Sequence, residues 1–154
     1  AEWSLSEMVE IFDLRGMLEA HAAEHAAIAP SPQGIAALRA ACEAGEAAMP
    51  GANLAAIEQI SEANVRFHQT LWDMGGQHRT RATLISLAVP PMILRNFRKF
   101  NEANLRRSLA QYREMTEAIA ARNPSWAGAV MRAHVEAGKA VFLAAAVQAG
   151  QEAA

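Results

Sequence analysis

Apolar residues recur at helical spacing through most of the chain. The clearest segment covers residues 61–72, where Asn64 and His68 lie four residues apart and project from neighbouring turns of one helix face. The apolar members of the same face are Ile57, Ile60, Phe67 and Leu71. Leaving a buried polar group unpaired costs roughly 1–3 kcal/mol. We therefore expect other parts of the chain to meet Asn64 and His68 inside the fold.

Local signals predict where the helices begin. Ser4-Leu-Ser-Glu7 has the pattern of a capping box, and Ser108-Leu-Ala-Gln111 is a second candidate for one. Ser31-Pro32 and Asn123-Pro124 each combine a capping side chain with a proline in the first turn. Asn53 is placed to cap the helix that carries Asn64 and His68.

Prolines and glycines predict where the helices end. The first helix should stop at Pro30, the second at Met49-Pro-Gly51, the third at Gly75-Gly76 and the last at Gly150. A fourth helix should start near Gln77 and kink at Pro90-Pro91, because two prolines remove two backbone hydrogen-bond donors. The helix should continue after the kink through apolar residues, namely Met92, Ile93, Leu94, Phe97 and Phe100. Short connections favour antiparallel neighbours, so the sequence predicts one all-α domain over residues 1–154, an antiparallel bundle of about six or seven helices.

Three further polar residues lie on apolar helix faces. Arg15 lies on the inward face of the first predicted helix, Tyr112 on that of the helix that ends before Asn123, and His134 on that of the last helix. The apolar residues of these faces are, in the same order, Met8, Ile11, Leu18, Ala22 and Ala26; Leu109, Met115 and Ile119; and Trp126, Val130 and Val141. Together with Asn64 and His68 these residues come from four helices and predict a polar cavity inside the bundle. The guanidinium of Arg15 suits a carboxylate held by two hydrogen bonds. Two alternatives remain: an internal ion pair of Arg15 with Glu19 or another acid, and a set of polar groups that only satisfy one another.

Composition agrees with a helical domain and excludes several other classes. Of the 154 residues, 52% are hydrophobic and only 6% aromatic, and much of the hydrophobic content is alanine, which favours closely packed helices. Charged residues make up 19% with a net charge of −2, so the chain has no overall basic field for nucleic acid. The one cysteine, Cys42, excludes an internal disulfide and is compatible with a cytoplasmic location. We find neither a membrane-spanning run nor a signal-like core.

Four motifs carry a family resemblance. They are similar to those of the FCD domain, the C-terminal effector-binding domain of FadR-subfamily GntR bacterial transcription regulators, and run in order from about residue 5 to 145. In this chain they are Arg15-Gly-Met-Leu-Glu19, Asn64-Val-Arg-Phe-His68, Ser108-Leu-Ala-Gln-Tyr112 with Glu117-Ala-Ile119, and Ala127-Gly-Ala-Val-Met-Arg-Ala-His134. The resemblance implies a seven-helix bundle that binds a small effector, often an organic acid, forms a homodimer and lacks catalysis. DNA would be read by a winged helix N-terminal to these residues.

The resemblance also implies a divalent metal of the zinc or nickel class, held in many members by one Asp and three His. The matching positions here are Asn64, His68, Tyr112 and His134. A neutral amide and a phenol replace two of the four ligands, and such groups bind zinc poorly. We therefore expect the metal to be absent or weakly held, while the cavity survives. Arg15 and neutral donors must then neutralise an anionic effector, and a protonated histidine would strengthen binding as the pH falls toward ~6.5.

Two other motifs suggest alternative functions. His21-Ala-Ala-Glu24-His25 matches the pattern of inverted zinc peptidases, which would make the chain a helical metal-dependent hydrolase. A solvated helix surface explains the same residues without catalysis. A basic cluster consists of Arg95, Arg98, Lys99, Arg106 and Arg107. We interpret it as the exposed face of a helix rather than as a phosphate-binding surface. Within this cluster, Arg95 is predicted as a secondary ligand contact at the mouth of the cavity.

Overall fold

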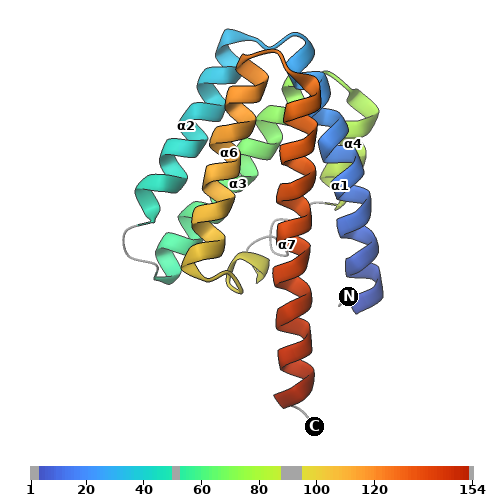
Figure 1. The fold of residues 1–154 in the computed structure, drawn as a ribbon, viewed down its shortest axis with the longest axis vertical. Helices are drawn as coiled ribbons and strands as arrows, with labels where there is room; N and C mark the ends of the chain where they lie inside the picture. The colour runs from blue at the N-terminus through green and yellow to red at the C-terminus, as the bar shows by residue number, and fades with distance from the viewer. Residues whose placement is uncertain (1–3, 50–52, 88–94, 153–154) are drawn as a thin grey trace.

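The computed structural model describes residues 4–49, 53–87 and 95–152, with side chains described up to residue 148. Within these ranges the chain is helical and contains no strand. The helices are α1 (Leu5–Ile28), α2 (Pro32–Ala48), α3 (Leu54–Met74), α4 (His78–Leu87), α6 (Glu102–Ala120) and α7 (Pro124–Glu152). Figure 1 shows them as an upright bundle in which α1 and α7 run side by side in opposite directions. The predicted all-α antiparallel bundle is confirmed.

Most of the predicted caps form as expected. The Ser4 hydroxyl accepts a hydrogen bond from the backbone N–H of Glu7, whose carboxylate accepts one from the backbone N–H of Ser4. The side chains of Ser31, Asn53 and Asn123 each accept a hydrogen bond from the backbone N–H three residues later. Gly76 has a φ of 63°, a left-handed conformation that favours glycine after the end of α3.

Two predicted boundaries are wrong. Ser108 does not cap a helix. Helix α6 already begins at Glu102, where the Asn101 side chain accepts a hydrogen bond from the backbone N–H of Asn104, and Ser108 is buried inside the helix. Gly150 does not end the last helix, because α7 continues to Glu152. The predicted kink at Pro90-Pro91 and the apolar run after it as far as Leu94 lie outside the described residues.

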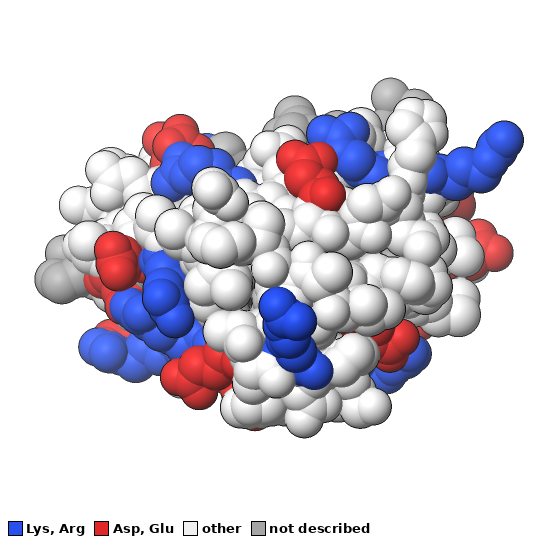
Figure 2. All heavy atoms as spheres, turned by 90° about the horizontal axis from the view of Figure 1, so that it is seen from above, with Lys and Arg blue, Asp and Glu red and all other residues white. Residues whose placement is uncertain are grey.

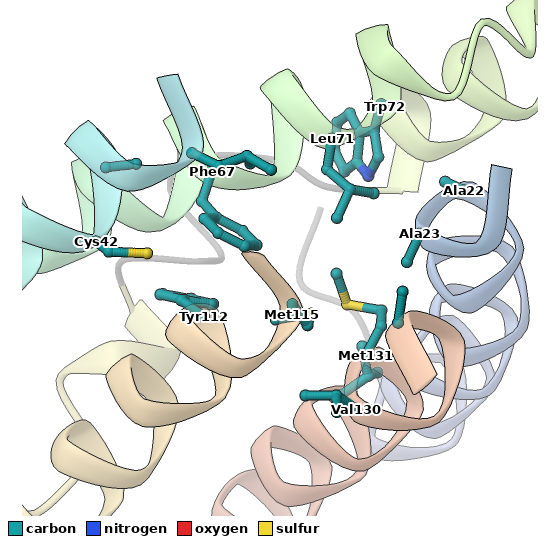
Figure 3. Close-up of a cluster of buried hydrophobic side chains, with 14 of the residues drawn as sticks. Ala22, Ala23, Cys42, Phe67, Leu71, Trp72, Tyr112, Met115, Val130 and Met131 are labelled. Carbon is teal, nitrogen blue, oxygen red and sulfur yellow. The ribbon is translucent and has the colours of Figure 1, made fainter. Parts of the chain in front are cut away.

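The core lies where α3, α6 and the α1–α7 pair face one another. The aromatic rings of Phe67 on α3 and Tyr112 on α6 stack with centroids 4.5 Å apart and an angle of 22° between their planes. Figure 3 shows this pair beside Cys42 of α2, with Met131 of α7 pointing into the same core. On α1 the side facing α7 and α3 is built largely from small, fully buried residues: Ala20, Ala22, Ala23, Ala26 and Ala27. Alanine lets the helices approach closely, and the polar residues of the predicted set lie just beyond this apolar layer.

Candidate functional site

The predicted polar residues converge in the middle of the bundle. The ring of His68 on α3 lies 5.5 Å from that of His134 on α7 and 6.1 Å from that of Tyr112 on α6, measured between centroids. The rings of Tyr112 and His134 are 4.9 Å apart. The Asn64 amide donates a hydrogen bond to the Tyr112 hydroxyl. Three helices therefore bring these four side chains together.

Glu19 connects Arg15 to this group. Its carboxylate is fully buried on α1 and accepts hydrogen bonds from Arg15, at 2.9 Å to Nε and 2.5 Å to Nη2. The same carboxylate accepts a hydrogen bond from His68 Nδ1 and one from Trp72 Nε1 at 3.3 Å. The ion pair that the sequence offered as an alternative for Arg15 therefore forms, and Glu19 was missing from the predicted site. The four-residue spacing from Arg15 was the available signal.

Charge in this centre is balanced by Glu19 and its partners. Burial disfavours the Glu19 carboxylate, but His68 and Arg15 outweigh this penalty and hold the pKa of Glu19 well below its usual range. Burial raises the pKa of the Tyr112 phenol to about 12, so the phenol stays neutral. Burial, reinforced by the neighbouring His68, lowers the pKa of His134 to about 3. With this pKa, His134 is neutral at pH 6.5 and does not add the positive charge that a protonated histidine was expected to supply.

The low pKa of His134 predicts that acid destabilises the protein. Since this imidazole is neutral when folded but has a pKa of ~6.5 when unfolded, the unfolded state takes up the proton first as the pH falls. The contribution of His134 to the free energy of unfolding is therefore fully present above pH ~6.5. Below that pH it decreases by up to about 1.4 kcal/mol per pH unit. Urea unfolding at several pH values between 7 and 5 should show this slope, and His134→Gln should flatten it. Glu19, whose pKa is also lowered in the folded state, reduces the free energy of unfolding only below pH ~4.3, the pKa of an unfolded glutamate. An unchanged slope in His134→Gln would contradict the assignment.

A cavity opens beside the polar centre. It is bounded by α1, α3, α6, α7 and the segment 95–100, and its polar lining comes from Arg15, Asn64, Asn96, Asn104, Arg107, Ser108, Gln111 and His134. The described lining includes two arginines and no acidic side chain. The cavity volume is about 50 Å³, small beside the ~300–1,000 Å³ of most ligand pockets. A ligand of ordinary size would fit only if some of the lining side chains moved.

Three buried polar atoms near this cavity have no hydrogen-bond partner among the described residues: His68 Nε2, Asn96 Oδ1 and Ser108 Oγ. Asn96 and Ser108 line the cavity directly. Buried polar atoms are seldom left unpaired, and each is a place where a ligand or water can bind. Neither Asn96 nor Ser108 was predicted as a site residue.

The donor set does not fit the metal implied by the resemblance. Asn64 is engaged with Tyr112, and neither side chain is anionic. The Glu19 carboxylate, which contacts this group, already accepts hydrogen bonds from Arg15 and His68. Within the described ranges, no three His, Cys, Asp or Glu side chains are grouped as metal ligands. Two imidazoles alone make a poor zinc site.

Within the basic cluster, Arg107 belongs to the described cavity lining, whereas Arg95, Arg98, Lys99 and Arg106 do not. Arg95, predicted as a secondary ligand contact, is exposed and is absent from the described lining. Arg98 contacts Glu58 at 3.5 Å and Arg106 contacts Glu102 at 2.6 Å, so these basic residues are partly neutralised at the surface. Figure 2 shows acidic and basic side chains interspersed on the face that it presents. No helix in the described residues is long and apolar enough to span a membrane.

The motif His21–His25 forms part of the α1 surface. The two imidazole rings lie 4.3 Å apart at an angle of 63°, with His21 exposed and His25 half-buried against Gln77. The carboxylate of Glu24 points toward Gly128 on α7. No third ligand for a metal lies with them among the described side chains.

Comparison with known proteins agrees with this architecture. The chain is similar to Streptococcus agalactiae GntR, with 23% identity and a TM-score of 0.64, over 84% of this chain and 56% of that one. It is also similar to E. coli McbR/YncC, with 20% identity and a TM-score of 0.80, over 92% of this chain and 70% of that one. At these identities the likeness establishes the fold alone. No curated protein matches the chain in sequence.

The family itself is established by sequence. The FCD domain model matches residues 10–137, which is most of the chain and includes all four motifs. The interpretation as an effector-sensing domain of a regulator is confirmed, and nothing in the comparisons supports the hydrolase alternative. The chain belongs to the FCD domain family.

Proposed function

We propose that the chain senses a small organic acid, which binds in the cavity beside Arg15. The observation that carries this proposal is the charge of the lining: two arginines and no acidic side chain among the described residues. Arg15 is the deeper of the two, with a side chain only 11% exposed. Although Glu19 pairs with one edge of this guanidinium, the N–H groups on its other edge can form charge-assisted hydrogen bonds with an entering carboxylate.

Glu19 supports Arg15 without blocking it. The contact with Glu19 uses Nε and Nη2, one edge of the guanidinium. The remaining N–H groups, including those of Nη1, stay available to a ligand. Asn64, Gln111 and His134 add neutral hydrogen-bonding groups around the same space. Tyr112 and His68 lie directly behind them and fix Asn64 and Glu19 respectively.

Regulation follows from the small volume of the cavity. An effector that enlarges the cavity moves residues of α1, α6 and α7, so it favours one arrangement of these helices over another. In a GntR-type regulator this change would reach DNA through a winged helix N-terminal to the domain, within a homodimer. The chain spans 56% of the length of S. agalactiae GntR, so these partners belong to the proposal for the whole protein.

Binding should not depend on a metal. Titrating the purified chain with small carboxylates by calorimetry, with and without a chelator, is expected to give affinities that agree within about twofold, because Arg15 supplies the positive charge. Loss of binding on chelation would show that a metal completes the site. A complete lack of carboxylate binding in both conditions would disprove the proposed function.

A further inference from the structure

The cavity lining combines polar and apolar side chains. We call Arg15, Ser108 and His134 the polar wall, and Met8, Phe12, Phe97, Phe100 and Val135 the apolar wall. The rest of the polar lining is Asn64, Asn96, Asn104, Arg107 and Gln111. A ligand that contacts both walls must be amphipathic.

The polar wall suits a single carboxylate. The free edge of Arg15 offers N–H donors, and the Ser108 hydroxyl is 3% exposed and has no partner in the described part of the chain. A carboxylate oxygen accepts hydrogen bonds from both kinds of group. The second arginine, Arg107, is exposed and donates to Asn104 at 3.2 Å, so it lies at the outer edge of the cavity.

The apolar wall is held in place by its own contacts. The rings of Phe97 and Phe100 stack with centroids 5.0 Å apart and an angle of 25° between their planes. The rings of Phe12 and Phe142 lie 5.6 Å apart between centroids, and the Lys99 ammonium lies 4.3 Å from the centre of the Phe142 ring. Such a wall presents aromatic faces and offers no hydrogen bonds to hydroxyl groups on a ligand.

We infer that the effector is a monocarboxylic acid with a short hydrocarbon tail, aliphatic or aromatic. This inference rests on the proposed function and narrows it. The carboxylate binds between Arg15 and Ser108, and the tail lies along Phe12, Phe97 and Phe100. Sugar acids and dicarboxylates fit less well, because additional polar groups placed against these three phenylalanines would lose water and gain no hydrogen bond from the rings.

Gly138 gives a way to test where the tail lies. It lines the cavity on α7, and a Cβ atom added there would lie 3.8 Å from Cε1 of Phe12, an ordinary contact distance. Gly138→Ala therefore reduces the space of the cavity beside the apolar wall without straining the helix. Gly16 is a matched control: its added Cβ would lie 3.8 Å from Cγ1 of Val135 in the same α1–α7 interface, but Gly16 is absent from the described cavity lining.

The experiment is calorimetric titration of the chain at pH 7.5 with acetate, butanoate, phenylacetate, succinate and gluconate. Butanoate should bind up to about 15-fold more tightly than acetate, about fourfold for each added methylene. Phenylacetate should also exceed acetate, and succinate and gluconate should bind more weakly than butanoate. Gly138→Ala should weaken phenylacetate binding at least about fivefold, the effect of about 1 kcal/mol of overpacking, and leave acetate binding unchanged, whereas Gly16→Ala should change neither affinity.

The outcomes separate this inference from the proposed function. If succinate or gluconate binds most tightly, the cavity takes organic acids but the hydrocarbon tail is wrong. If phenylacetate binds equally well to Gly138→Ala and to the unmodified chain, the tail does not lie on this wall and the inference is overturned. If none of the five acids binds, the proposed function fails and the inference fails with it.

Discussion

Replacing Glu19 with glutamine is expected to lower the free energy of unfolding by about 3–5 kcal/mol, the usual cost of removing one partner of a buried ion pair. The carboxylate is fully buried, and the Arg15 side chain that it neutralises is only 11% exposed. Glutamine keeps nearly the same shape and can still accept hydrogen bonds from His68 and Trp72. The loss therefore comes from the uncompensated guanidinium rather than from a cavity. Urea unfolding followed by circular dichroism at pH 7 measures it.

The ion pair between Arg113 and Glu46 provides the matched control. It also joins an arginine to a glutamate through two hydrogen bonds, at 2.6 and 2.5 Å, but both side chains are about 40% exposed. Glu46→Gln should cost less than about 1 kcal/mol, because water solvates the arginine that is left behind. Similar losses in the two variants would show that Glu19 has no special role in the centre of the bundle.

Sequence patterns were sufficient to predict most of the architecture, because they depend on local chemistry. Ser4, Ser31, Asn53 and Asn123 cap their helices through side-chain oxygens that reach only three residues ahead. Helical periodicity likewise predicts the face on which a residue lies. Inward faces from three helices were therefore enough to predict that Asn64, His68, Tyr112 and His134 would meet.

Local patterns were misleading where two signals competed. Ser108 begins a pattern that resembles a capping box, but Asn101 offers a stronger start seven residues earlier, and the apolar face continues through Leu105 and Leu109 without a break. A single glycine costs only about 1 kcal/mol inside a helix, which is too little to stop α7 at Gly150.

The cavity itself depends on contacts that no local pattern encodes. Asn96, Phe97 and Phe100 follow the Pro90-Pro91 pair, and the sequence does not specify how the chain returns to the bundle after two prolines. Glu19 follows Leu18, which was predicted to face inward, yet Glu19 is fully buried and Leu18 only partly. Because α1 packs against α7, α3 and α4 together, its buried face is wider than the single apolar stripe of a surface helix, and Glu19 lies within this wider face.

The second large effect is expected on ligand affinity and requires a double variant. Arg15→Ala alone would leave the buried Glu19 carboxylate with only His68 and Trp72, so a loss of binding could reflect altered folding. Arg15→Met/Glu19→Gln removes both charges and keeps the volume of the pair. Replacing a buried ion pair by groups of similar size is often neutral or stabilising. The double variant should therefore be more stable than Glu19→Gln, which unfolding measurements on both variants can show.

Carboxylate affinity in this double variant should fall at least about 30-fold, since removing one partner of a buried charge pair across an interface costs 2–5 kcal/mol or more. Calorimetric titration with butanoate measures the loss in a protein whose folding has been checked independently. Arg107→Gln is the control: Arg107 also lines the cavity but is exposed, so its removal should change affinity less than about fivefold and mainly at low salt. A stronger effect from Arg107 than from Arg15 would place the carboxylate at the outer edge of the cavity. Undiminished binding in the double variant would show that the effector is recognised without the buried guanidinium, and the charge argument for the cavity would no longer hold.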